Sequence, residues 1–214
     1  PARPPPALVQ PRDYHGMHRL SVVVTLVVLA GGVGFAVQAL TERDAEVMGE
    51  KLQAIVDRSV LEPGDRTPLV TSFTERQVNA YLRFVAGPTL PVGLLDPTIA
   101  IGDNGKVSGR ARVDLDAIRK SKPRSALDPM AYLSGTVEVA VAGVLESSRG
   151  QGKVTLGSAT VGGVSVPKSL VQEMVSYFTR TPENPQGVDL DRPFDLPARI
   201  QQVRTRAGHA TIVQ

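Results

Sequence analysis

Cysteine and tryptophan are both absent from this chain of 214 residues. Without cysteine the protein forms no disulfide, no iron–sulfur cluster and no thiolate zinc site. Aromatic residues make up only 4% of the chain, so we expect a core built from valine, leucine, isoleucine and alanine. A disulfide-free domain of about 170 residues is feasible, because it buries more than about two-thirds of its unfolded surface.

A strong charge of one sign is missing from most of the chain. The 24 basic and 21 acidic residues give a net charge of +3, of which +2 lies in residues 1–19, so the remainder carries +1. Nucleic-acid-binding domains typically present a basic surface. The composition therefore argues against a nucleic-acid partner.

Familiar catalytic motifs are also missing, including the nucleophile elbow, the HEXXH zinc motif and the P-loop. Asp114 and Asp116 alternate on one exposed strand face, which favours cross-strand pairing with arginines over acid–base chemistry. His15 and His18 could bind a metal or a lipid phosphate, but no third ligand is near, so we favour interfacial polar residues. His209 is expected on the surface. We predict no enzymatic activity, no metal and no cofactor.

What the chain does have is a charge-free run of 21 residues, Leu20–Leu40. At about 1.5 Å per residue, a helix of this length spans the roughly 30 Å hydrocarbon core of a bilayer. Basic residues precede the run and acidic residues follow it, so we expect a cytoplasmic N-terminus and an extracytoplasmic domain at a bacterial inner membrane. A cleaved signal peptide ending near Val37–Ala39 is the alternative, but the run is longer than a usual signal-peptide core.

The predicted span also contains a cluster of small residues, which permits close packing against other membrane helices. These helix-packing residues are Ala30, Gly31, Gly32, Gly34 and Ala36. The alternative is that glycine is simply common in membrane helices. The preceding tail, residues 1–19, is rich in proline and predicts an extended cytoplasmic segment.

Two helices are predicted after the span. Apolar residues recur at helical spacing over 43–61, which suggests a stalk within a stalk-and-linker region, 41–70. A second helix, 75–84, has Thr74 as its N-cap, Gln77 as the capping-box partner, and Phe73 and Val78 at the positions of a hydrophobic staple. The residues expected to face the core from this helix are Val78, Tyr81, Leu82 and Val85.

Period-two patterns predict three hairpins over the rest of the chain. The first joins 98–101 to 106–116 through Asn104-Gly105, the second joins 133–145 to 153–166, and the third joins 198–206 to 209–213. A helix over 168–179 begins at Pro167 and is expected to bury Leu170, Val171, Met174, Val175 and Phe178. Residues 71–214 are therefore expected to form an α+β domain, an antiparallel sheet with helices packed on one face.

A family resemblance covers residues 70–214. It rests on a helix that opens with the residues of 73–82, on the valine-rich hairpins that follow, and on a chain end formed by 194–200, Val203 and 207–213. This combination resembles uncharacterised bacterial membrane-anchored domains that have been likened to tubular lipid-binding folds. The resemblance implies contact with lipid and assigns no active-site residue.

A basic cluster is the most suggestive local feature of the predicted domain. Its members, a candidate patch for an anionic partner or lipid phosphates, are Arg110, Arg112, Arg119, Lys120, Lys122 and Arg124. The alternative, which we favour, is a solvated strand edge and loop, where lysine also blocks edge pairing.

These features predict a non-catalytic, single-span accessory subunit of a respiratory, photosynthetic or envelope membrane complex. Its partners would be other membrane-protein subunits and the lipid bilayer. The alternative is a membrane-anchored lipid-binding or lipid-handling envelope protein, which requires an apolar cavity between the sheet and the helices at 75–84 and 168–179. A hydrolase would require polar groups that converge in a cleft.

Overall fold

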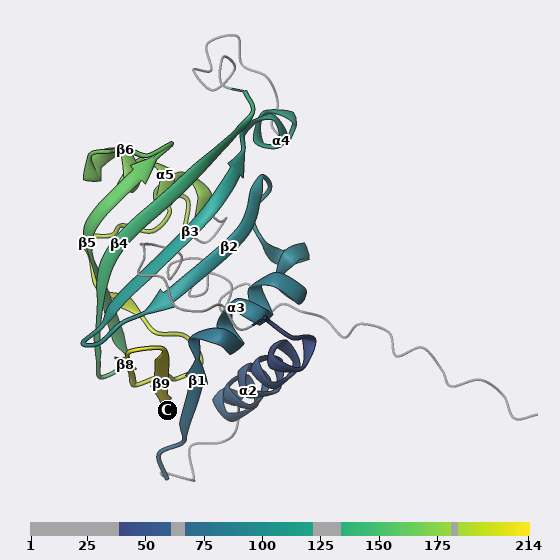
Figure 1. Ribbon diagram of the computed structural model, residues 1–214. Helices are drawn as coiled ribbons and strands as arrows, with labels where there is room; N and C mark the ends of the chain where they lie inside the picture. Colours follow the sequence, from purple (N-terminus) through teal and green to yellow (C-terminus); the bar gives the residue numbers. More distant parts are fainter. Residues whose placement is uncertain (1–38, 61–66, 122–133, 181–183) are drawn as a thin grey trace, which may run out of the picture.

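The computed structural model describes residues 39–60, 67–121, 134–180 and 184–214, which form antiparallel sheets and a few helices in an α+β arrangement (Figure 1). Within these ranges no helix combines the length and the apolar character needed to cross a membrane. The predicted tail, nearly all of the predicted span with its helix-packing residues, His15, His18, Lys122 and Arg124 lie outside the described residues.

A large antiparallel sheet forms most of the domain, in the order β2-β3-β4-β5-β6, with β7 also paired to β5. Its strands are β2 (Leu94–Ile101), β3 (Lys106–Asp114), β4 (Thr136–Ser148), β5 (Gln151–Val161), β6 (Val164–Ser165) and β7 (Phe194–Asp195). The two predicted hairpins in this region are both present, and each pairs neighbouring strands of the chain.

The turn between β2 and β3 forms where the sequence predicts it. Asn104 and Gly105 both adopt positive φ angles, 55° and 78°, which matches the two-residue turns that follow the twist of a hairpin. A Cβ atom on Gly105 would lie 2.2 Å from the Leu145 carbonyl oxygen, so only glycine fits this position.

A second, smaller sheet has the order β1-β9-β8, so the single predicted sheet is in fact two sheets. Its strands are β1 (Val70–Thr74), β8 (Gln202–Arg206) and β9 (His209–Val213). The β8–β9 hairpin was predicted, whereas β1 was not. This short strand pairs with the distant end of the chain, with Phe73 opposite Ala210.

The helical elements are α2 (Glu42–Val60), α3 (Glu75–Phe84), the 3₁₀ turn η1 (Gly87–Thr89), α4 (Leu115–Lys120) and α5 (Lys168–Phe178). The capping box of α3 is confirmed: Thr74 Oγ1 accepts from the Gln77 amide at 3.1 Å, and Gln77 Oε1 accepts from the Thr74 amide at 3.1 Å. Helix α2 lies beside α3 (Figure 1) and buries Ala45, Met48 and Ile55 in the core.

Some predicted details are wrong at element ends. Val85 and Leu170 were expected in the core but are 45% and 41% exposed; Val85 is the C-cap of α3, where the chain leaves the helical path. Strand β3 ends at Asp114 and not at Asp116, because the Asp114 carboxylate accepts from the Ala117 amide at 2.9 Å and caps α4. Pro167 is the N-cap of α5, one position before the helix.

Candidate functional site

An apolar cavity of about 140 Å³ lies between the two sheets. The large sheet contributes Ile99, Ile101, Val107, Leu145 and Val154 to its wall. The small sheet contributes Phe73, Val203, Thr205, Ala210 and Ile212. Lining residues that are two positions apart on one strand, such as Ile99 and Ile101, point to the same face of that strand, because successive side chains of a strand point to opposite faces.

Helices close another side of the cavity. Met48, Leu52 and Ile55 of α2 are spaced by four and three residues, which places them on one face of the helix. Helix α3 contributes Val78, and no described residue of α5 lines the cavity. The lipid-binding alternative required a cavity between the sheet and the helices at 75–84 and 168–179; the cavity of the structure is lined by α2 and α3 and by no described residue of α5.

Helix α5 instead packs at a separate part of the large sheet. Val171 is buried with Val141, Ala159 and Leu190 in a cluster of its own. The domain thus has an apolar cluster under α5 and a distinct cavity between the sheets.

The cavity wall contains one polar side chain among its described residues, that of Thr205. Its hydroxyl oxygen already accepts a hydrogen bond from the Gly105 amide at 2.7 Å. No titratable side chain is present in this lining, so the cavity has no group suited to acid–base or nucleophilic chemistry. An apolar ligand is the kind that such a wall accommodates.

The segment 194–200 forms a further wall, with Phe194, Leu196, Pro197 and Ile200 lining the cavity. The Phe194 ring lies over Gly152, where an added Cβ atom would be 2.8 Å from Cζ of the ring. Ala198 and Arg199 both have positive φ angles, 53° and 55°, an uncommon backbone for residues other than glycine. This bend allows Pro197 and Ile200 to face the same cavity.

The C-terminal residue ties this wall to α2. Nε2 of Gln214 donates to the carbonyl oxygens of Ala198 at 2.6 Å and Ile55 at 2.9 Å. Its Oε1 atom is buried and has no hydrogen-bond partner within the described part of the chain. The side-chain amide of Gln214 therefore connects the bend at 197–200 with α2, the helix that carries Met48 and Leu52.

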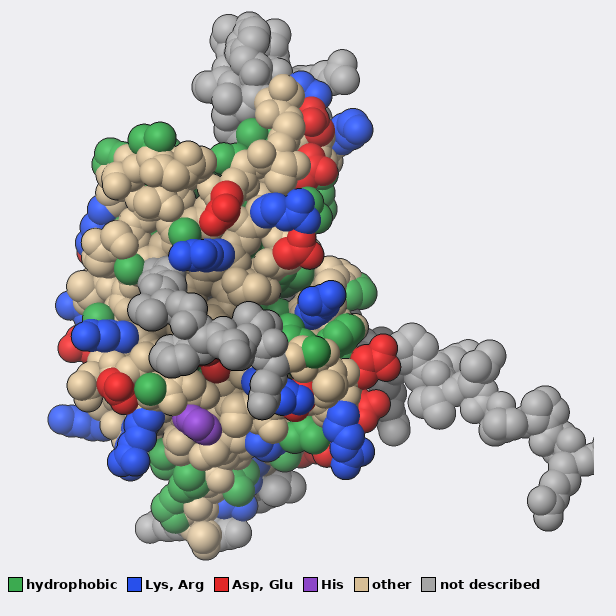
Figure 2. Space-filling view, in the orientation of Figure 1, with side chains coloured by type: hydrophobic (Ala, Val, Ile, Leu, Met, Phe, Trp, Pro, Cys, Tyr) green, Lys and Arg blue, Asp and Glu red, His purple; other side chains and the backbone are tan. Residues whose placement is uncertain are grey.

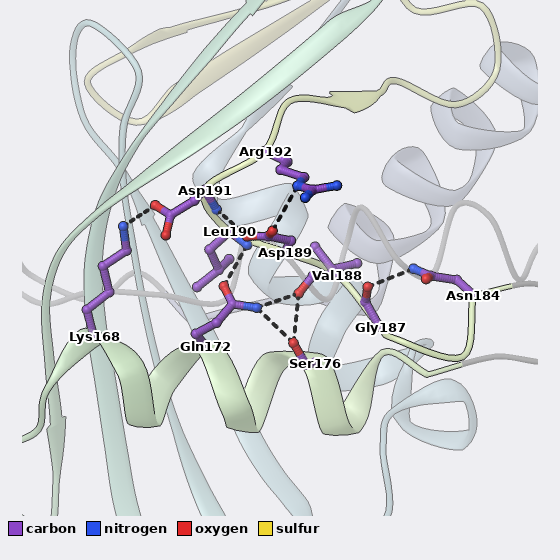
Figure 3. Close-up of polar contacts among 10 residues, drawn as sticks. All are labelled: Lys168, Gln172, Ser176, Asn184, Gly187, Val188, Asp189, Leu190, Asp191 and Arg192. Atoms are coloured by element: carbon purple, nitrogen blue, oxygen red, sulfur yellow. Dashed lines mark hydrogen bonds and ion pairs between the residues drawn. The ribbon is translucent and has the colours of Figure 1, made fainter.

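The chain segment that leads from α5 to Phe194 is held in place by side chains of α5 (Figure 3). Gln172 donates from Nε2 to the Val188 carbonyl oxygen at 2.9 Å and accepts through Oε1 from the Leu190 amide at 2.7 Å. Ser176 also donates to the Val188 carbonyl oxygen, and Lys168 forms an ion pair with Asp191. The chain between α5 and Phe194 is thus bonded to α5 at three residues, Val188, Leu190 and Asp191.

Four members of the predicted basic patch, Arg110, Arg112, Arg119 and Lys120, lie in the described residues. Arg112 pairs with Asp96 across β2 and β3, and Arg119 pairs with Asp116 within α4 at 2.6 Å. Arg110 is exposed on β3, and Lys120 ends α4.

The acidic residues expected to pair across strands have other partners. Asp114 caps α4, as described above, whereas Asp116 bonds to Arg119 and accepts from the Gly135 amide at 2.9 Å. His209 is exposed, as predicted. Among the described residues there is no group of three His, Cys, Asp or Glu side chains that could hold a metal ion.

One carboxylate has a shifted titration. The Thr41 hydroxyl hydrogen bond, together with the Arg76 guanidinium, lowers the pKa of Asp44 below its ordinary value. The Arg76–Asp44 ion pair measures 2.8 Å and joins the first turns of α3 and α2. Its role is structural, since neither side chain lines the cavity.

Comparison with known proteins adds no identity: no family model, no curated protein and no solved structure matches this chain.

Proposed function

We propose that this protein is a membrane-tethered, non-catalytic domain that binds an apolar ligand, a lipid acyl chain, in the cavity between its two sheets. The observation that supports this most is the chemistry of the wall. Every described lining residue except Thr205 is apolar, and the Thr205 hydroxyl oxygen accepts from the Gly105 amide.

The energetic cost of the cavity supports a ligand. The cavity is partly open, and its apolar side chains lack some of the packing contacts that a closed core supplies. Protein interiors are otherwise packed as densely as organic crystals. An apolar ligand that fills the space restores the lost contacts, whereas water gains too few hydrogen bonds there.

The size of the cavity sets the expected affinity. An engineered cavity of about 150 Å³ in another protein stays dry and binds benzene, so about six carbon atoms fit here. At about 0.8 kcal/mol per buried methylene, six carbons contribute about 5 kcal/mol before the entropic cost of association is deducted, so the cavity alone gives a dissociation constant no tighter than about 0.2 mM. A tighter ligand must make contacts beyond the cavity, as a long acyl chain with a headgroup would.

The predicted membrane span at 20–40 supports a lipid as the source of this chain, because a tethered domain meets membrane lipids continually. Under this proposal the domain lies on the extracytoplasmic side of a bacterial inner membrane. The accessory-subunit function stays a prediction, since its helix-packing residues at 30–36 lie outside the described residues.

The test is photochemical. The full chain in lipid nanodiscs is irradiated with a palmitate analogue that carries a diazirine near its methyl end, and the adducts are mapped by mass spectrometry. The proposal predicts adducts in the peptides that contain Met48 to Ile55, Phe73 and Leu196 to Ile200, and unlabelled palmitate should displace them. Adducts confined to 20–40, or spread evenly over the surface, would contradict it.

A further inference from the structure

Exposed apolar side chains gather on one short segment of the domain. Half of the large hydrophobic residues that are markedly exposed in the described chain lie between the end of α3 and the start of β2. They are Phe84, Val85, Val92 and Leu95, with exposures of 42%, 45%, 57% and 37%. Single exposed hydrophobic residues are ordinary, but a contiguous group marks an interaction surface. We call this segment, residues 84–95, the apolar ridge.

The apolar ridge contains no charged residue. In the sequence Arg83 precedes it, and Asp96, which forms an ion pair with Arg112, follows it. At one end the Arg83 guanidinium lies 5.6 Å from the centre of the Phe84 ring. At the other end Gly93 is packed against α4, where an added Cβ atom would lie 2.6 Å from Ile118 Cγ1. Lys120, which is exposed, is the last residue of α4 and follows Ile118 by two positions.

Nearby acidic groups are already engaged. Asp96 and Asp116 form ion pairs with arginines, and Asp114 caps α4. Within the described part of the chain, neither Arg83 nor Lys120 forms an ion pair. Figure 2 shows hydrophobic and basic side chains together over α3 and the adjoining segment. An apolar strip beside basic groups is complementary to a bilayer surface that contains anionic lipids.

The chain that precedes α2 indicates where such a bilayer would be. Residues 20–40 are predicted to span the membrane, and α2 begins at Glu42. Asp44 in the first turn of α2 pairs with Arg76 of α3, and Gly49 lies against Tyr81. The first turns of α2 and α3 thus lie together, and the last turn of α3, where the apolar ridge begins, is about 15 Å away, the length of a ten-residue helix.

We propose that the apolar ridge docks into the interfacial region of a bilayer that contains anionic lipids, with Arg83 and Lys120 at the headgroups. This inference goes beyond ligand binding in the cavity and rests on the predicted span. Docking would fix the orientation of a domain that a span alone would leave free to rotate.

The absence of cysteine allows a direct test. The full chain with Val92→Cys, labelled with the fluorophore NBD, is reconstituted into vesicles that contain phosphatidylglycerol. The control is Val164→Cys on β6, a valine of 68% exposure outside the ridge. We expect blue-shifted emission at position 92, together with roughly twofold or stronger quenching by doxyl lipids relative to position 164, and a smaller difference in phosphatidylcholine vesicles.

A second ridge reporter, Val85→Cys, should behave like Val92→Cys, so the test does not depend on one variant. Equal emission and quenching at the ridge and control positions would overturn the proposal, as would a blue shift at the ridge without quenching by doxyl lipids, which would indicate a protein contact. Alkaline carbonate extraction of the same vesicles tests the span separately. Palmitate capture, measured in parallel, distinguishes failure of docking from failure of the cavity proposal.

Discussion

The amide of Gly105 donates a hydrogen bond of 2.7 Å to the hydroxyl oxygen of Thr205. This bond joins the β2–β3 turn of the large sheet to β8 of the small sheet, at the only polar point in the described cavity wall. It satisfies a backbone donor that an all-apolar wall would leave without a partner.

We therefore expect Thr205→Val to destabilise the domain without weakening ligand capture. The valine keeps the shape of the side chain but leaves the Gly105 amide unpaired, at a cost of about 1–3 kcal/mol. Scanning calorimetry of the full chain in detergent should show a lower Tm, while palmitate photolabelling at a temperature well below Tm stays within about twofold of the wild type. A severe loss of labelling by the folded variant would show that Thr205 contacts the ligand.

Asp44→Asn should reduce stability in a pH-dependent way. The pKa of Asp44 is lowered in the folded protein by Thr41 and Arg76, so its carboxylate stabilises the fold above the ordinary aspartate pKa of about 3.9. That contribution is lost as the pH falls through the lower, folded-state pKa. The wild type should therefore exceed the variant in Tm at pH 7, and the difference should shrink towards pH 3.

Glu46→Gln, an exposed carboxylate on the same helix, is the matched control and should show a smaller difference at pH 7. A Tm difference for Asp44→Asn that stays constant from pH 7 to pH 3 would argue against the ion pair as its cause.

Gln172→Ala should loosen the chain that leads to the cavity wall. The variant removes the bonds to the Val188 carbonyl oxygen and the Leu190 amide, so we expect faster hydrogen exchange over 187–196. Exchange measured by mass spectrometry should leave the α3 peptides unchanged. Glu173→Ala, an exposed neighbour on α5, is the control; equal acceleration in both variants would indicate general destabilisation of the helix.

Local chemistry explains what could be predicted from the sequence. The capping box at Thr74 and Gln77 and the turn at Asn104-Gly105 depend on neighbouring residues alone, and both form as expected. Strand β1 was missed because its partner lies at the other end of the chain: Val70 pairs with Val213. A segment of five residues with little alternation of polar and apolar side chains does not predict a strand with such a distant partner.

The cavity itself was beyond prediction for a related reason. Periodicity assigns Ile99 and Ile101 to a buried face, but it does not determine whether the opposing wall touches them. That distance depends on the second sheet and on the bend at Ala198 and Arg199. Whether the buried faces form a solid core or line a cavity could therefore not be decided from the sequence.

The ligand-binding account is tested most directly by filling the cavity. Ala210 lines it from β9, and Ala210→Leu would occupy part of the 140 Å³. Ala140→Leu is the matched control, since Ala140 is a half-buried strand alanine outside the cavity wall.

The decisive measurement is photolabelling of the two variants by diazirine palmitate, with the Tm of each recorded. If the cavity binds the acyl chain, Ala210→Leu should label at least about fivefold less than Ala140→Leu. Its Tm should not fall below that of the wild type, because the leucine side chain supplies packing contacts that the open cavity lacks. Equal labelling of the two variants, with Ala210→Leu folded, would place the ligand elsewhere and contradict the account.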